Sequence, residues 1–200
     1  MKYLILLNVL DKIREEAPNL MSKTYKSNSS VDKINYSRSR AFIHLYLKVS
    51  FGILDFMERE WFITDKAYDG GVDGYYLDKD TRVIYFIQSK FRASSANFEC
   101  KEISLNEILV MNIERIIDGE VNDENGNSYN GKIKQLQREI SELHDVARYS
   151  YKVVILANLS GVTTSQLKKL TSEFNSEVFD YNRSYNELAP RYIWYLLYCV

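Results

Sequence analysis

A nearly continuous apolar run of strand length, residues 152–159, is the feature that most constrains the fold of this chain. A strand with apolar side chains on both sides must be covered on both faces, which is typical of a central strand. A helical pattern follows, with Thr163 or Thr164 as its N-cap, and then a short strand over residues 177–181. This strand–helix–strand order predicts an α/β fold in which helices flank a mixed β-sheet.

Length and composition describe one folded domain over residues 1–200. The chain is 46% hydrophobic and 14% aromatic, which is enough to form a substantial core and excludes a disordered chain. The formal net charge of -1 provides no overall positive field for nucleic acid, so nucleic-acid binding would need basic residues gathered on one face.

Features that report on cellular location favour the cytoplasm. Cys100 and Cys199 are the two cysteines of the chain, too few for a disulfide framework or a zinc site. The apolar run at residues 3–7 is too short for a signal-peptide core. Charged residues interrupt the longer apolar stretch at residues 41–57, which predicts a buried helix and no membrane span.

The remaining elements follow from periodicity and turn residues. Serine-rich residues 23–35 predict a loop, and Ser37 or Ser39 is the expected N-cap of the helix after it. Helices are predicted over residues 1–17, 40–60, 105–117, 133–147 and from near Tyr185. Strands are predicted over residues 72–77 and 82–91, joined by a turn at residues 78–81.

Acidic and polar residues gather on this predicted hairpin. Asp69 and Asp73 lie in the glycine-rich segment at residues 69–74, and Gln88 and Lys90 stand two positions apart where the second strand ends. Metal-dependent phosphodiester cleavage needs oxygen ligands for Mg²⁺ and a cation that stabilises charge developing on the phosphate. The hairpin therefore predicts a nuclease site.

The predicted pairing register brings these residues together. If the turn has four residues, Leu77 pairs with Arg82, and Asp73 lies opposite Phe86. Asp73 and Gln88 are then diagonal neighbours on one face, within reach of a shared ion. Each residue also has an ordinary explanation, because acids are common beside Gly-Gly turns and lysines guard strand edges. Their occurrence together on one hairpin favours chemistry.

The same residues resemble a known family. The sequences at residues 63–65, 69–74 and 84–91 are similar to the N-terminal nuclease domain of abortive-infection phage-resistance (AIPR) proteins and to the wider Mrr-like branch of PD-(D/E)xK endonucleases. The resemblance covers residues 41–91, and residues 152–158 stand where the family has its next core strand. It implies a restriction-endonuclease-like three-layer core, DNA as the partner and substrate, and a role in phage defence.

The resemblance also implies roles for individual residues. Asp73 would be the first ligand of Mg²⁺ or Mn²⁺, Gln88 would take the second-acid position, and Lys90 would be the motif lysine. The Ser89 carbonyl would add a backbone ligand. No small-molecule cofactor is expected. Asp65 and Asp69 would line the opening of the same site.

Two departures from the family pattern leave questions open. Gln88 stands where relatives carry Asp or Glu, and a neutral amide binds Mg²⁺ more weakly than a carboxylate. Relatives often carry a helical glutamate, for which Glu58 and Glu60 are the candidates here, whereas His44 is expected to be an ordinary core or surface histidine. The family's proteins are usually longer, so the chain is either an N-terminal domain of a longer protein or a short stand-alone version.

Three functions are compatible with these observations. The first is a metal-dependent DNA endonuclease. The second is a nuclease-like fold kept for nucleic-acid binding or protein assembly, which Gln88 and the near-zero charge favour. The third is a protein-interaction domain with Asp73 and Lys90 as a structural ion pair, favoured by the 16 tyrosines and the apolar residues 192–200. A homodimer is one of the open oligomeric states.

Overall fold

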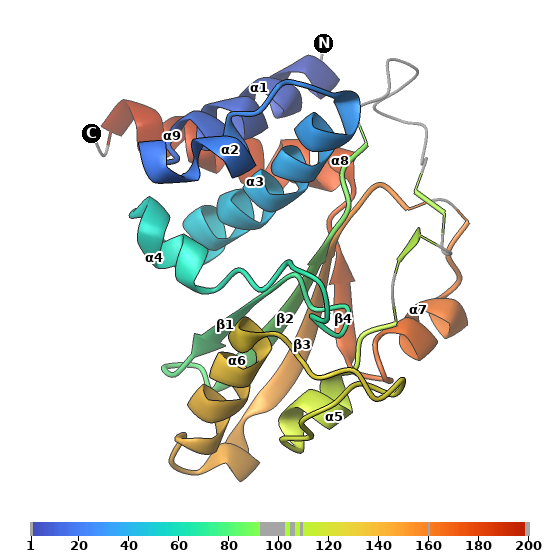
Figure 1. The fold of residues 1–200 in the computed structure, drawn as a ribbon. Helices are drawn as coiled ribbons and strands as arrows, with labels where there is room; N and C mark the ends of the chain where they lie inside the picture. Colours follow the sequence, from blue (N-terminus) through green and yellow to red (C-terminus); the bar gives the residue numbers. More distant parts are fainter. Residues whose placement is uncertain (1, 93–102, 105–106, 109, 160, 199–200) are drawn as a thin grey trace.

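A four-stranded mixed sheet forms the centre of the molecule (Figure 1). The computed structural model describes residues 2–92, 103–104, 107–108, 110–159 and 161–198. In the order β1-β2-β3-β4, β1 is antiparallel to β2, while β2, β3 and β4 are parallel. The strands are β1 (Gly74–Asp78), β2 (Val83–Ser89), β3 (Ser150–Leu156) and β4 (Asn175–Val178).

Helices cover both faces of this sheet, as the sequence predicted (Figure 1). The central strand β3 alternates between the two, because Val154 and Leu156 belong to one core and Val153 and Ile155 to the other. The first face carries α1 (Lys2–Glu15), α3 (Val31–Phe51) and α9 (Ala189–Tyr198). The second face carries α5 (Ile113–Ile117), α6 (Gly131–Ser141) and α7 (Thr164–Leu170).

Short helical segments connect these elements. They are η1 (Asn19–Met21), α2 (Ser22–Tyr25), α4 (Phe56–Trp61), η3 (Val146–Arg148), α8 (Tyr181–Arg183) and η4 (Ser184–Leu188). Thr163 caps α7 with a complete capping box, as one of the two predicted caps. Among the described residues, every helix is too short or too polar to cross a membrane.

The predicted helix over residues 40–60 is wrong at both ends. The helix α3 already begins at Val31, because the Ser30 side chain accepts a hydrogen bond from the Lys33 amide as N-cap. Ser37 instead lies inside α3 and donates to the Ile34 carbonyl (2.9 Å). Gly52, in the left-handed conformation at φ 70°, ends α3, and α4 is a separate helix.

Other predicted boundaries also move. The helix α5 begins only at Ile113, because the preceding segment bonds to neighbouring elements, with the Met111 amide on the Leu170 carbonyl. The helix α6 ends at Ser141, before a reversal at Asp145 (φ 61°) that leads into β3. The final helical segment starts at Tyr181 and not near Tyr185. Cys100 and Cys199 lie outside the described residues.

The hairpin forms, but its register differs from the prediction. Leu77 pairs with Ile84 instead of Arg82, and Gly74 pairs with Ile87. The turn is shifted because the Asp78 side chain accepts the amides of the turn residues, and Arg82 takes a left-handed conformation (φ 55°). The shift of two positions keeps every side chain on its predicted face. Asp73 directly precedes the paired residues, and its amide donates to the Ile87 carbonyl (2.8 Å), so it does not lie opposite Phe86.

Candidate functional site

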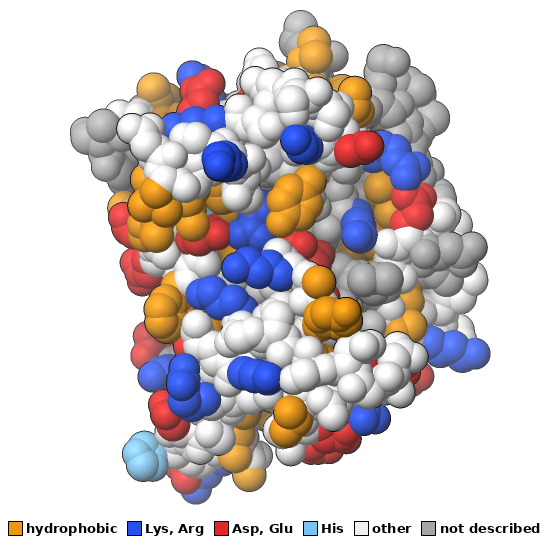
Figure 2. All heavy atoms as spheres, in the orientation of Figure 1, with side chains coloured by type: hydrophobic (Ala, Val, Ile, Leu, Met, Phe, Trp, Pro, Cys, Tyr) orange, Lys and Arg blue, Asp and Glu red, His pale blue; other side chains and the backbone are white. Residues whose placement is uncertain are grey.

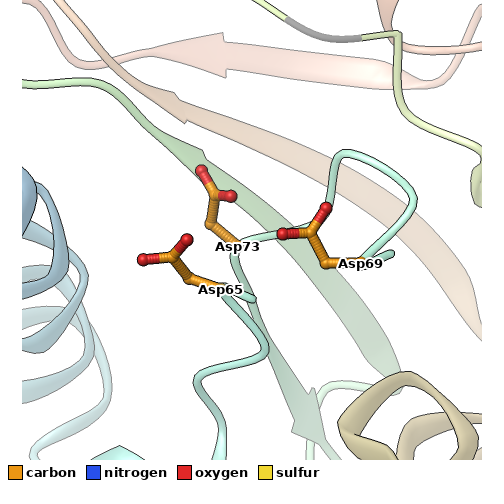
Figure 3. A group of neighbouring side chains, drawn as sticks. All are labelled: Asp65, Asp69 and Asp73. Carbon is orange, nitrogen blue, oxygen red and sulfur yellow. The ribbon is translucent and has the colours of Figure 1, made fainter. Parts of the chain in front are cut away.

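Three aspartates come together where β1 begins, and Figure 3 shows their side chains gathered there. Asp65, Asp69 and Asp73 each offer a carboxylate oxygen within 4.8 Å of the other two, and they form the aspartate cluster. Asp73 directly precedes β1, and its Oδ2 accepts the Ser89 amide (2.7 Å) at the end of β2. The hairpin thus holds Asp73, and the preceding loop brings the other two acids to it.

Backbone hydrogen bonds fold this loop back on itself. The amides of Thr64 and Asp65 both donate to the Asp73 carbonyl (3.0 and 3.1 Å). Gly71 has φ 76°, and a Cβ there would lie 2.6 Å from the Val110 carbonyl oxygen, so only glycine fits. Its amide donates to Asp69 Oδ1 (2.9 Å), which orients that carboxylate. The glycine-rich sequence is therefore needed for the placement of the acids.

Burial and mutual repulsion disfavour charge on all three acids. Asp73 is 7% exposed, and burial, followed by the charges of Asp65 and Asp69, raises its pKa well above the ordinary value. Burial, followed by the charge of Asp65, raises the pKa of Asp69 to about 6. Burial raises the pKa of Asp65 too, against the opposing effect of Arg40 and Lys90. A bound divalent cation would remove this repulsion.

An open cavity of about 230 Å³ lies beside the aspartate cluster. Asp65 and Asp73 line it together with Lys90 at the end of β2, and the Lys90 charge lowers the pKa of all three aspartates. The predicted partners Asp73 and Lys90 therefore do face one space. The lining is completed by Asn35, Tyr36, Ser39, Ser89 and Phe91.

Ser89 joins this cavity to α3 through a serine that the sequence analysis missed. Ser39 Oγ donates to the Ser89 carbonyl (2.7 Å), and Ser89 Oγ donates to the Ser39 carbonyl (2.8 Å). The Ser89 carbonyl retains a second lone pair that could bind an ion, as predicted from the resemblance. The sequence suggests only a helix-cap role for Ser39, because its hydrogen-bond partner Ser89 is fifty positions away.

Gln88 stabilises the site without lining its cavity. It is 1% exposed, and its Nε2 donates to the Gly71 carbonyl (2.7 Å), so the amide holds the loop between Asp69 and Asp73. Gln88 is not among the residues that line the cavity. Its role as a second metal ligand stays a prediction, whereas its contact with the loop is a feature of the structure.

The two candidate glutamates have different environments. Glu60 Oε1 accepts Arg40 Nη2 (2.6 Å), and Arg40 Nη1 in turn donates to the Asp65 carbonyl (3.0 Å) and lies 3.4 Å from Asp65 Oδ2. Glu60 therefore reaches the aspartate cluster only through Arg40. Glu58 is exposed on α4, where its amide is capped by Asp55. The structure does not bring Glu58 to this site.

His44 is a core histidine, as predicted. It is fully buried, its ring stacks on Phe56, and its Nδ1 accepts Arg59 Nε (3.2 Å). Its Nε2 lies 3.1 Å from Glu60 Oε2, which also accepts the hydroxyl of Tyr25. Burial lowers the pKa of His44 to about 4, so the ring is neutral and serves as a structural link.

Comparisons with protein-family models, curated proteins and solved structures found no match to this chain. The functional information therefore comes from the site itself. Three carboxylates provide an all-oxygen donor set, which is the set that Mg²⁺ and Mn²⁺ prefer. Lys90 adds a positive charge to the lining of the cavity.

Proposed function

We propose that this protein is a Mg²⁺- or Mn²⁺-dependent nuclease that hydrolyses phosphodiester bonds in DNA. The observation that carries the proposal is the aspartate cluster, two members of which, Asp65 and Asp73, line one cavity together with Lys90. Three carboxylates within 4.8 Å of one another repel each other, and this arrangement is favourable when a divalent cation binds between them. A lysine on the open side of such a site suits a phosphodiester.

Different residues would contribute metal binding, phosphate binding and positioning. Asp65, Asp69 and Asp73 would hold the metal ion, which when bound polarises a phosphate and lowers the pKa of water. Lys90 would bind a non-bridging phosphate oxygen and stabilise the negative charge that develops as the bond to phosphorus breaks. Ser39 and Gln88 keep the end of β2 and the acidic loop in place, so that this geometry exists before substrate binds.

We assign the fold to the restriction-endonuclease-like class, in the Mrr-like branch of PD-(D/E)xK nucleases and nearest to AIPR proteins. The support is the order of the motif on the hairpin, with Asp73 before β1 and Gln88 and Lys90 at the end of β2. Parallel pairing of β2 with β3 provides the next core strand. The resemblance makes phage defence in the cytoplasm the proposed setting.

A second function rests on Gln88. Its neutral amide holds Gly71 (2.7 Å), where relatives carry an acidic metal ligand. A site with this substitution could bind nucleic acid while hydrolysing it weakly or not at all. This candidate differs from the first in needing no metal for its function.

Nicking of supercoiled plasmid by the purified protein tests both. We expect nicking with Mg²⁺ or Mn²⁺ that EDTA abolishes, and a loss on the order of a hundredfold in Lys90→Met because its phosphate contact is gone. Lys79→Met is the matched control, since Lys79 is an exposed lysine in the turn of the same hairpin. Full activity of Lys90→Met would contradict the first function. Salt-sensitive DNA binding without cleavage would support the second.

A further inference from the structure

A large exposed aromatic side chain is held in place at the end of α4. Trp61, the last residue of α4, is 53% exposed. Its ring nitrogen donates to Glu139 Oε1 (3.1 Å), and the Lys132 ammonium lies 4.6 Å from the ring centroid. Glu139 is itself fixed by the Tyr75 hydroxyl (3.0 Å). An aromatic ring that stays exposed yet ordered loses little entropy on binding, which is typical of a contact surface.

One lysine lies beside this ring, and a second lysine acts on the first through its charge. Lys132 donates to the Trp61 carbonyl (2.8 Å), and Lys66 is exposed on the loop that follows α4. Burial, followed by the charge of Lys66, lowers the pKa of Lys132, so the two like charges act on each other. Figure 2 shows Lys and Arg side chains across the middle of this face, next to hydrophobic side chains. Like charges that lie near each other on a surface favour a polyanionic partner.

The ring and the aspartate cluster belong to one rigid unit. Directly after α4, Ile63 forms a β-bridge with Gly74, and the Asp65 amide donates to the Asp73 carbonyl. Asn130, the N-cap of α6, binds the carbonyls of Thr64 and Ala67 and so secures the same loop. The end of α4, which carries Trp61, is therefore fixed relative to the aspartate cluster.

We propose that Trp61, Lys66 and Lys132 bind an unpaired segment of nucleic acid, with one base stacked on the Trp61 ring and its phosphates on the two lysines. Stacking on an exposed aromatic ring requires a base whose face is open, which a paired base inside a duplex lacks. The inference rests on the proposed function, because it places the part of the substrate that lies beyond the aspartate cluster. It adds that single-stranded segments are the preferred form.

The fluorescence of Trp61 itself reports on this contact. The chain contains two tryptophans, so Trp194→Phe, on α9, leaves Trp61 as the single emitter. We titrate this full-length protein with oligothymidylate in EDTA, which prevents cleavage, and expect saturable quenching. A duplex of the same length should bind more weakly and leave the emission nearly unchanged, since it offers no open base.

Variants test separately the contributions of base stacking and of lysine charge to oligonucleotide binding. Trp61→Ala should weaken oligothymidylate binding roughly tenfold, and Trp61→Phe should retain most of the affinity. Lys66→Gln should reduce the slope of log K against log salt by about 0.7, as expected for one phosphate contact on a single strand. Lys134→Gln, an exposed lysine on α6, is the matched control and should change neither value. Circular dichroism confirms that each variant is folded.

The outcomes distinguish this inference from the proposed function. Trp61 emission that stays constant while fluorescence anisotropy shows the oligonucleotide saturated would overturn the stacking site, whatever the nicking assay gives. Equal affinity of Trp61→Ala and wild type would do the same. Asp73→Asn should still quench on binding, because it removes a negative charge and leaves the Trp61 surface unchanged, and loss of binding in this variant would also contradict the inference.

Discussion

Two groups of buried charged residues lie side by side in this molecule, and they are built in opposite ways. The paired network, made of Glu16, Arg40, His44, Arg59 and Glu60, matches each charge with a partner. Arg59 is fully buried, yet it bonds to Glu16, to His44 Nδ1 and to the carbonyls of Ile53 and Leu54. Burial would raise the pKa of Glu60, but hydrogen bonding from His44 and the charge of Arg40 lower it.

The aspartate cluster has the reverse arrangement. Its three carboxylates lie within 4.8 Å of one another, and the pKa of each member is raised. The two groups meet where Arg40 contacts Asp65.

The difference shows which group is structural and which is suited to bind something else. A buried charge that finds its partner inside the protein contributes a fixed scaffold, although the net energy of such pairs is small. Buried carboxylates that face one another leave their compensation to a ligand, and at such places perturbed pKa values point to a functional site. We therefore place function in the aspartate cluster and its cavity, and a supporting role in the paired network.

The largest expected effect tests the aspartate cluster. Asp73→Asn should lower metal-dependent nicking by about a hundredfold or more, because second-shell changes alone cost roughly 10–100-fold in metal affinity. The increase in Tm that Mg²⁺ or Mn²⁺ gives the wild type should disappear. In EDTA the variant should melt above the wild type, since repulsion with Asp65 and Asp69 is relieved. An unchanged metal response would show that the cluster binds no cation.

The next largest effect tests the paired network. Arg59→Met should destabilise the protein by about 3 kcal/mol or more, because removing one partner leaves Glu16 and His44 with unmatched polar groups in the interior. Urea denaturation measures this loss. The Tm increase from Mg²⁺ should persist, because Arg59 does not contact the aspartate cluster. If the metal response vanished together with stability, the two regions would be one functional unit.

A smaller effect appears as a pH dependence of opposite sign in the two regions. The folded-state pKa of Asp69 is about 6, above its ordinary value of 3.8, so the folded protein holds a proton that the unfolded chain releases. This group therefore lowers the stability of the metal-free protein as pH rises from about 4 to about 6. Glu60, with its lowered pKa, adds stability that is lost as pH falls through its folded-state pKa.

The variant Asp69→Asn tests the contribution of Asp69 to this pH dependence of stability. The difference in Tm between variant and wild type in EDTA should grow between pH 4 and pH 6 and then level off. Mg²⁺ should reduce this difference, because cation binding favours the ionised carboxylate. A difference that is constant with pH would show that Asp69 titrates as an ordinary exposed acid.

The smallest effects come from the two glutamates of α4, which are a matched pair. Glu58→Gln should change stability by less than about 0.5 kcal/mol and leave nicking unchanged, because Glu58 is exposed. Glu60→Gln should cost about 1–3 kcal/mol, since it removes the charge that Arg40 and His44 contact. Parallel urea denaturation and nicking assays compare the two. Reduced nicking in Glu58→Gln with normal stability would mean that it reaches the site after all.

Much of the fold could be predicted because its signals are local. The apolar run of β3 and the helix after it specify a sheet covered on both faces. The hairpin was found, but its turn was placed one residue early, since Arg82 in a left-handed conformation is not an expected turn residue. The predicted start of α3 is too late, because Ser37 and Ser39 are also suitable helix caps by residue type.

Prediction of the site succeeded for some residues and failed for others, again because the sequence carries mainly local signals. Asp73 and Lys90 line one cavity together with Ser89, whereas Gln88, which was predicted on the same face as Asp73 and Lys90, does not line it. Asp65 and Asp69 belong to the cluster, where the sequence had placed them only at its mouth. Glu58 and Glu60 could not be told apart, since they are two residues apart and point to opposite sides of α4, and the sequence does not show which side faces the interior.

By itself, the sequence determined the layers of the fold, the hairpin, the glycine loop and the set of acidic residues beside Lys90. These depend on periodicity, on turn residues and on the conformational freedom of glycine, which act between near neighbours in the chain. Only the tertiary structure decided that three aspartates meet, that Gln88 holds Gly71, and that Arg40 joins Glu60 to Asp65. The contacts of Gln88 and Arg40 link residues 17 to 25 positions apart. Packing of α3 on the sheet and of α4 on α3, not local preference, sets their distances.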